Sequence, residues 1–313
     1  MPQRRRKPVR TTAVLLVGTM ALAGCEAQVS GSPPTPLGPL STMVAPLGAM
    51  APLPEAAPDE PAGGFSGLAG RERLATDEAA RAGAKIAVAA LDRNTGQLTT
   101  NGNGMTMSIA SVVKLFIADD LLLQVSRGET RLSPQDRESL DAMLRASDDS
   151  AAEVFWGRSG GSAIVDRVVA RYGLGSTRPP GNGRWFNTTS TATDLVRYYD
   201  MLLAGTGGLP AEQTDIILSN LAASTPIAPD GMMPGGVYPQ RFGIPEALFA
   251  EPVAVKQGWM CCVSADWMHL STGVIGPGRR YVVVIGSMQP GPDDVARQTI
   301  TQAVKTMFPG GRI

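Results

Sequence analysis

The order of the expected helices and strands is the feature that most restricts the fold of this 313-residue chain. Hydrophobic periodicity and turn residues predict a helix, two strands, a run of helices, three strands and a closing helix. In chain order these elements are expected at residues 71–82, 85–92, 97–100, 108–125, 134–145, 151–156, 163–172, 192–203, 252–257, 268–274, 281–288 and 292–307. Strands at both ends of a helical insert predict an α+β fold, with a sheet subdomain, a helical subdomain and a cleft between them.

Short polar sequences mark several of these boundaries. Asn94-Thr95-Gly96 is typical of a hairpin turn between two strands. Ser133 directly precedes Pro134, which predicts a helix N-cap followed by proline at the first helical position. Thr191 or Thr193 is expected to cap the helix over residues 192–203.

The first 24 residues have the pattern of an export signal peptide. Five basic residues stand within residues 4–10, and the apolar stretch from Thr12 to Ala23 is too short to span a bilayer core of about 30 Å. The stretch ends in Leu22-Ala23-Gly24-Cys25, which resembles a bacterial lipobox. The resemblance implies cleavage before Cys25 and acyl chains on it, which anchor the mature protein to the extracytoplasmic face of the cell membrane. An ordinary signal peptide with a nearby cysteine is the alternative.

Residues 25–70 are expected to form a lipid-anchored tether, and residues 71–313 the folded domain. Between Glu26 and Gly64 there are nine prolines and no lysine or arginine, a composition that cannot bury enough apolar surface to fold. Without the five basic residues of the leader, 23 basic residues face 28 acidic ones. This mildly acidic body argues against a nucleic-acid-binding protein.

One serine–lysine pair has the spacing of a nucleophile and its base. Of the five lysines, only Lys114 has a serine three positions earlier, Ser111. The pair falls near the start of the helix expected over 108–125, where backbone N–H groups and the helix dipole favour a developing anion. At this spacing the amine lies one turn on and can reach the hydroxyl. Because a serine becomes a nucleophile only when a neighbouring base takes its proton, the pair is a candidate for covalent catalysis.

Two further motifs follow in order along the chain. Ser147-Asp148-Asp149 follows the helix expected over 134–145, and Lys256-Gln257-Gly258 lies on an expected strand. With Ser111-Val112-Val113-Lys114 they resemble the S-x-x-K, S-D-N and K-T-G motifs of the serine β-lactamase and penicillin-binding protein superfamily, above all its class A-like branch. The resemblance covers roughly residues 71–313. It implies a β-lactamase/transpeptidase-like α+β fold, in which N- and C-terminal helices flank an antiparallel sheet and a helical subdomain spans about residues 104–205.

The resemblance also implies a role for each motif residue. Ser111 is the acylated nucleophile, Lys114 its base, and Ser147 the group that passes a proton to the leaving nitrogen. The backbone N–H groups of Ser111 and Trp259 form the oxyanion hole, and Lys256 attracts the substrate carboxylate. Burial and a neighbouring Lys256 cation are expected to lower the pKa of Lys114. The implied substrates are β-lactams or D-Ala-D-Ala-like cell-wall peptides, with no cofactor.

Departures from the family pattern bear on activity. Asp149 stands where the family has asparagine, and a carboxylate close to Lys114 is expected to raise its pKa and weaken it as a base. Gln257 replaces the usual threonine or serine, which weakens the hydroxyl contact to a substrate carboxylate. The stretch 183–187 matches the one that carries the deacylating glutamate in class A enzymes, but it has no carboxylate. The short distance in sequence between the first two motifs indicates that part of the helical subdomain is missing.

Other features have competing interpretations. Residues 157–161 fit the G-x-S-x-G nucleophile elbow, and Asp266 and His269 could complete a triad, but a helix is expected where the elbow needs a strand. Cys261 and Cys262 could form a vicinal disulfide, pair with another molecule or remain thiols. Together with His269 the two cysteines are one ligand short of the four that a zinc site of these residues needs, so no such site is expected. Trp259 either lines a ligand cleft or covers the end of the sheet.

Two classes of function follow from these observations. The first is a lipid-anchored serine hydrolase or acyltransferase that forms an acyl-enzyme on Ser111 and deacylates slowly. The second is a catalytically impaired lipoprotein that binds cell-wall material or a protein partner. The intact motif residues favour the first class, whereas the departures favour the second.

Overall fold

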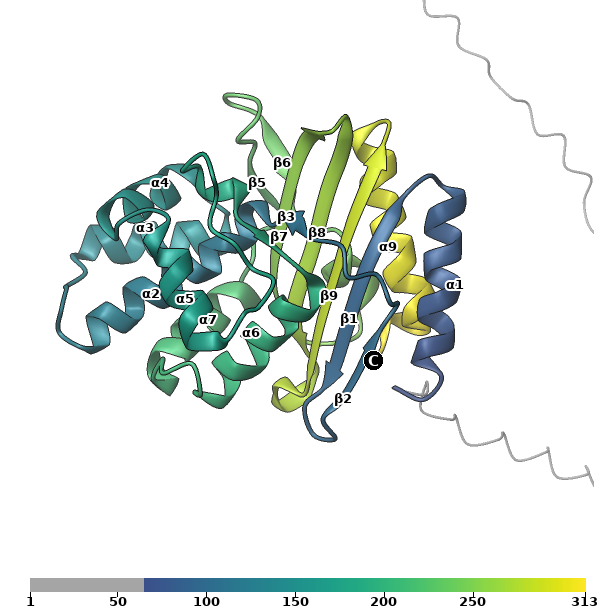
Figure 1. Cartoon of the computed structure of the whole chain (residues 1–313), viewed down its shortest axis with the longest axis horizontal. Helices are drawn as coiled ribbons and strands as arrows, with labels where there is room; N and C mark the ends of the chain where they lie inside the picture. The colour runs from purple at the N-terminus through teal and green to yellow at the C-terminus, as the bar shows by residue number, and fades with distance from the viewer. Residues whose placement is uncertain (1–64) are drawn as a thin grey trace, which may run out of the picture. The chain divides into compact units, whose positions relative to one another are not determined.

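The central sheet is built from strands that come from the two ends of the domain. The computed structural model describes residues 65–313 (Figure 1). Its five-stranded sheet has the order β2-β1-β9-β8-β7, and each neighbouring pair is antiparallel. The strands are β1 (Lys85–Asp92), β2 (Gln97–Thr100), β7 (Val253–Val263), β8 (Asp266–Ile275) and β9 (Tyr281–Pro290). The α+β class and the antiparallel sheet expected from the sequence are therefore confirmed.

Helices cover both faces of this sheet (Figure 1). α1 (Leu68–Arg81) and α9 (Asp293–Met307) pack against each other on one face. The opposite face carries the helical subdomain, which consists of α2 (Lys114–Ser126), α3 (Pro134–Arg145), α4 (Asp149–Arg158), α5 (Ala163–Tyr172), α6 (Ala192–Ala204) and α7 (Ala211–Ala222). The short elements are β3 (Met107–Ser108), η1 (Ala110–Val113), η2 (Trp185–Asn187), β4 (Thr189–Ser190), β5 (Ile227–Pro229), β6 (Val237–Pro239), α8 (Ile244–Ala247), η3 (Pro277–Arg279) and η4 (Pro309–Gly311).

The sheet is apolar on both faces because each face is covered. On β1, Ile86 and Val88 belong to the core beneath α1 and α9, whereas Ala87 and Ala89 belong to the core shared with the helical subdomain. Successive side chains of a strand point to opposite faces. A strand buried on both sides therefore reads as a continuous apolar run.

Local sequence signals account for the elements that were predicted accurately. Ser133 accepts a hydrogen bond from the backbone N–H of Asp136, and the Asp136 carboxylate accepts one from the backbone N–H of Ser133, so α3 begins in a capping box with Pro134 at its first position. Thr191, and not Thr193, caps α6 through the backbone N–H of Asp194. Both helices begin directly after the residue that was predicted to cap them.

The structure differs from the prediction in the bounds of several elements, among them α1, α4 and β7, and most clearly in two places. The helix expected over 108–125 is divided into β3, η1 and α2, because Ala110 has a φ of +42° and interrupts regular helical geometry. The helix α7 and the strands β5 and β6 were not predicted. α7 follows Pro210 and has no side-chain cap, so the strongest local signal of a helix start is missing.

The predicted signal peptide, the lipidation residue Cys25 and the tether up to Gly64 lie outside the described residues. Over residues 65–313, none of the helices is both long enough and apolar enough to cross a membrane.

Candidate active site

A tight turn at the start of α2 brings Ser111 and Lys114 together. The Lys114 Nζ lies 2.9 Å from the Ser111 Oγ. The turn depends on backbone conformations that are costly for ordinary residues, since Ala110 directly before Ser111 has a positive φ. β7 comes very close to this turn, and a Cβ on Gly258 would lie 2.6 Å from the Ile109 carbonyl oxygen. Only glycine at position 258 lets the strand approach η1 this closely.

Ser147 connects the two lysines of the motifs. It lies just before α4 with a φ of +56°. Its Oγ is 3.1 Å from the Lys114 Nζ and 2.8 Å from the Lys256 Nζ. Ser111, Lys114, Ser147 and Lys256 thus form one unbroken chain of hydrogen bonds, which can move protons between the two serines.

Burial dominates the electrostatics of this chain. Lys114 is 0% exposed and Lys256 is 1% exposed. Burial lowers the pKa of Lys114, although the nearby Asp149 carboxylate opposes the shift. Burial and then the charge of Lys114 lower the pKa of Lys256 well below its ordinary value. Burial therefore disfavours the charged form of both lysines, and a charge on one lysine further disfavours a charge on the other.

Asp149 is the first residue of α4 and forms an ion pair with Lys114. Its Oδ1 lies 2.5 Å from the Lys114 Nζ, while its side chain remains 40% exposed. The segment after β5 closes over the carboxylate, and a Cβ on Gly231 would lie 2.1 Å from Asp149 Oδ2. Asp149 therefore occupies a position where it holds the Lys114 Nζ and also contacts the solvent side of the site.

A cavity of about 330 Å³ opens above Ser111. Its walls come from η1, α4, η2, the segment after β5, and β7. The lining residues are Ala110, Ser111, Asp149, Glu153, Trp185, Phe186, Gly231, Met232, Trp259, Met260 and Cys261. Trp259 lines this cavity and also stacks on Tyr238, with the ring centroids 4.4 Å apart.

Two residues expected to contact a substrate carboxylate do not line the cavity. Lys256 lies beneath it and is held by Ser147. Gln257, the next residue on β7, points to the other face of the sheet, where its Nε2 donates to the Phe242 carbonyl oxygen at 2.5 Å. The Gln257 Oε1 is buried and has no hydrogen-bond partner. Neither the Lys256 amine nor the Gln257 amide therefore reaches the cavity.

Glu153 is a site residue that the sequence interpretation missed. It follows Asp149 by four positions on α4, so both carboxylates lie on one helical face and reach the cavity. The Trp185 Nε1 donates to Glu153 Oε2 at 3.0 Å, and the Lys114 Nζ lies 4.8 Å from the centroid of the Trp185 ring. The i, i+4 spacing of Glu153 from Asp149 was the feature of the sequence that could have identified it as a site residue. The stretch 183–187 contributes Trp185 in place of a carboxylate.

The alternative sites are not assembled. Ser159 terminates α4, so the G-x-S-x-G stretch follows a helix and not a strand. His269 contacts Tyr238 and Asp293 instead of a serine, with 2.6 Å between the Tyr238 hydroxyl and the His269 Nε2. Cys261 and Cys262 are free thiols, and Cys262 is exposed. No group of three or more potential metal ligands occurs within residues 65–313.

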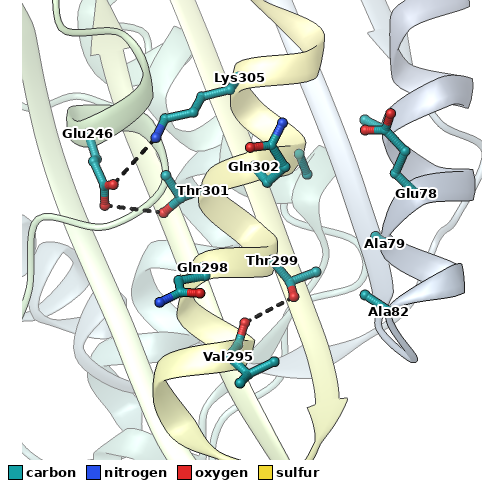
Figure 2. A pocket seen from close by; sticks show the side chains of 12 residues that line it. Glu78, Ala79, Ala82, Glu246, Val295, Gln298, Thr299, Thr301, Gln302 and Lys305 are labelled. Carbon is teal, nitrogen blue, oxygen red and sulfur yellow. Dashed lines mark hydrogen bonds and ion pairs between the residues drawn. The ribbon is translucent and has the colours of Figure 1, made fainter.

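A second cavity, of about 420 Å³, lies between α1 and α9 on the far face of the sheet. Figure 2 shows Glu246 joined to Lys305 and Thr301 on one side, with Ala79 of α1 and Ala82, which follows α1, facing α9 on the other. None of the residues that line this groove is a serine, cysteine or histidine. The groove therefore offers no nucleophile comparable to Ser111, and the cavity above Ser111 is the candidate active site.

The sequence is similar over almost its whole length to mycobacterial proteins. The proteins named "Putative lipoprotein LppW" in Mycobacterium tuberculosis and Mycobacterium bovis are each 54% identical over 320 residues, which covers 99% of this chain and 100% of the relative. No protein-family model matches the chain.

Solved structures with a similar fold are β-lactamases. A β-lactamase from Chitinophaga pinensis has a TM-score of 0.60 at 15% identity and covers 76% of this chain and 98% of that structure. A class A β-lactamase from Bacteroides cellulosilyticus has a TM-score of 0.61 at 13% identity and covers 77% and 97%. The TLA-1 extended-spectrum β-lactamase has a TM-score of 0.62 at 14% identity and covers 77% and 98%. The fold expected from the three motifs is confirmed, and at these identities the likeness concerns the fold alone.

Proposed function

Because the chain belongs to the family of the mycobacterial LppW proteins and has the fold of the class A β-lactamases, we propose that it is a serine hydrolase or acyltransferase. We propose that it forms an acyl-enzyme on Ser111. The observation that supports the proposal is the 2.9 Å contact between the Ser111 Oγ and the buried Lys114 amine at the floor of the cavity. A hydroxyl held by a desolvated amine is an activated nucleophile.

In the proposed reaction, the proton that Ser111 loses reaches the leaving group through the hydrogen-bonded chain of side chains. Neutral Lys114 accepts the Ser111 proton as the Oγ attacks the acyl carbon. The oxyanion accepts hydrogen bonds from the backbone N–H groups of Ser111 and Trp259. When the bond from the acyl carbon to the leaving atom breaks, the leaving group takes a proton from Ser147. Lys114 then returns a proton to Ser147 across their 3.1 Å hydrogen bond, which leaves an ester on Ser111 and a neutral lysine.

The proposed enzyme deacylates slowly. β-Lactams and D-Ala-D-Ala-like cell-wall peptides are the substrates that the fold suggests. Release of the acyl group needs a base within reach of a water beside the ester. The stretch 183–187 has no carboxylate, and Trp185 occupies the wall that it forms. We therefore expect an ester that forms and persists.

Mass spectrometry of the intact protein tests the proposal directly. The soluble domain is incubated separately with a labelled penicillin and with an uncharged fluorophosphonate, which modifies activated serines. We expect one adduct on Ser111 with at least one reagent and none in Ser111→Ala. Ser219→Ala, which removes an exposed hydroxyl on α7, is the matched control and should label like the wild type. A folded wild-type protein that neither reagent modifies would contradict the proposal.

A specific observation favours a second candidate function, that of a binding lipoprotein. The Lys114–Asp149 ion pair stabilises the ammonium form of Lys114, and an ammonium cannot accept the Ser111 proton. If Lys114 stays charged at neutral pH, the cavity binds a ligand without reacting. The absence of any adduct together with measurable ligand binding would select this function.

We further propose that residues 1–24 are a lipoprotein signal peptide and that Cys25 carries the lipid anchor. Residues 25–64, the part of the predicted tether that precedes the folded domain, then hold the domain at the extracytoplasmic face of the membrane; Phe65 and Leu68, which were assigned to the tether, belong to the buried core. The lipobox-like Leu22-Ala23-Gly24-Cys25 and the name of the mycobacterial relatives support this proposal. Cys25→Ala should abolish detergent-phase partitioning of the full chain, whereas Cys262→Ala should leave it unchanged. Unchanged partitioning of Cys25→Ala would exclude the anchor.

A further inference from the structure

The chemistry of the cavity wall differs from that of a site for anionic substrates. Most of its surface is apolar, and the apolar side chains that line it include Trp185, Phe186, Met232 and Met260. Within the described part of the chain, the only charged side chains that line it are Asp149 and Glu153, and none is lysine, arginine or histidine. A carboxylate-bearing ligand would meet two carboxylates and no cation.

The two lysines below the cavity do not compensate for this charge. Lys114 is wholly buried and paired with Asp149, and Lys256 is buried and held by Ser147. Gln257 has its side chain on the opposite face of the sheet. Glu153 is exposed, and its carboxylate accepts a hydrogen bond from the Trp185 indole. The net charge that faces a ligand is therefore negative.

We propose that the cavity above Ser111 takes an aromatic acyl donor that carries an ammonium group, and that it discriminates against acyl donors that carry a carboxylate. The ammonium lies near Glu153 and against the indole and phenyl faces of the cavity wall, which attract cations. The aromatic group displaces water from the apolar wall. The inference rests on the proposed function in that Ser111 attacks the carbonyl carbon of this ligand, by the proton transfers given above.

Equilibrium binding tests the ligand class without requiring a reaction. Calorimetry on Ser111→Ala compares benzyltrimethylammonium with phenylacetate, which have similar aromatic bodies and opposite charges. We expect the cation to bind at least about tenfold more tightly at low ionic strength. The preference should narrow as salt is added, because salt screens the partly exposed carboxylates.

Matched variants test whether Glu153 causes the preference for the cation over the anion. Glu153→Gln in the Ser111→Ala background should reduce the cation-to-anion ratio at least about threefold. Glu246→Gln removes a carboxylate from the groove between α1 and α9 (Figure 2) and should leave the ratio unchanged. Equal binding of the two ions, tighter binding of phenylacetate, or binding of neither ion would overturn the inference.

The fluorophosphonate experiment keeps this inference separate from the proposed function. Ser111 labelling without a cation preference would retain the enzyme and reject the ligand class. A cation preference that depends on Glu153, with no Ser111 labelling, would retain the ligand class in a binding protein and reject the enzyme.

Discussion

Two networks of titratable side chains lie on opposite faces of the same sheet, and one of them reaches the cavity above Ser111. The front network, defined as Ser111, Lys114, Ser147 and Lys256, faces the helical subdomain and ends at the surface of the cavity. The rear network joins β6, β8 and α9 on the other side of the sheet. Both contain a hydroxyl and a nitrogen base in direct contact.

The rear network, defined as Tyr238, His269 and Asp293, has the composition of a catalytic relay but not its access. His269 is 0% exposed and Tyr238 is 3% exposed, and Trp259 stacks over the Tyr238 ring. Burial raises the pKa of Tyr238 and lowers that of His269, so both are neutral at pH 7. The two networks therefore differ in access more than in residue type, because each places a hydroxyl in contact with a nitrogen base.

The largest expected effect comes from breaking the front network. Lys114→Met keeps the length and burial of the side chain but removes the base, so the acylation rate of Ser111 should fall by about 10²–10⁴-fold. Time-resolved mass spectrometry of the fluorophosphonate adduct measures this rate. Lys305→Met, an exposed lysine on α9, is the matched control. An acylation rate within threefold of the wild type would show that Lys114 is not the base.

The opposite pattern is expected when the rear network is broken. His269→Leu removes a buried hydrogen-bond partner from Tyr238 and should lower the free energy of unfolding by about 1–3 kcal/mol, or roughly 5–150-fold in the folding equilibrium. The acylation rate should change less than twofold. Urea unfolding and adduct formation on the same samples give both values. A large loss of acylation at unchanged stability would make His269 part of the active site.

The pH dependence of the free energy of unfolding also tests the structural role of the rear network. Folding lowers the pKa of His269 below its ordinary value of 6.5, so the unfolded chain takes up this proton first. This contribution to stability is complete above about pH 6.5 and decreases as the pH falls below that value, by at most about 1.4 kcal/mol per pH unit. The urea midpoint of the wild type should be lower at pH 5.5 than at pH 7.5. In His269→Leu the difference between the two pH values should be smaller.

A moderate effect is expected from changing the link between the front network and solvent. The Asp149 carboxylate lies 2.5 Å from the Lys114 Nζ and raises the pKa of Lys114. Asp149→Asn removes this carboxylate and should therefore lower the pKa of Lys114. A lower pKa makes the neutral base available at lower pH. Acylation at pH 7 should therefore accelerate about tenfold, and the rise of the rate profile should shift to lower pH by about one unit. An unchanged or slower rate between pH 6 and 9 would indicate that Asp149 itself assists the proton transfer.

The difference between these networks also explains what the sequence could predict. Ser111 and Lys114 lie three residues apart, so their contact is local and could be expected from the spacing alone. Contacts such as Tyr238 with His269, or Gly231 with Asp149, join segments that are distant in sequence. They depend on β5, β6 and the segment between them, which no local pattern predicted. The orientation of Gln257 likewise depends on the face that the register of β7 gives it.

The smallest expected effect concerns release of the acyl group. Glu153 is the one carboxylate besides Asp149 on the cavity wall, but it is exposed and already accepts the Trp185 indole hydrogen bond. A solvated, hydrogen-bonded carboxylate is a weak acceptor for a proton from water, so the ester on Ser111 should persist for minutes or longer. Glu153→Gln should change its lifetime less than threefold. The decay of a labelled adduct, followed after the reagent is removed, measures this lifetime in the wild type and the variant. Steady turnover of several molecules per second that requires Ser111 would refute slow deacylation, and a Glu153→Gln adduct that lives more than tenfold longer would identify Glu153 as the missing base.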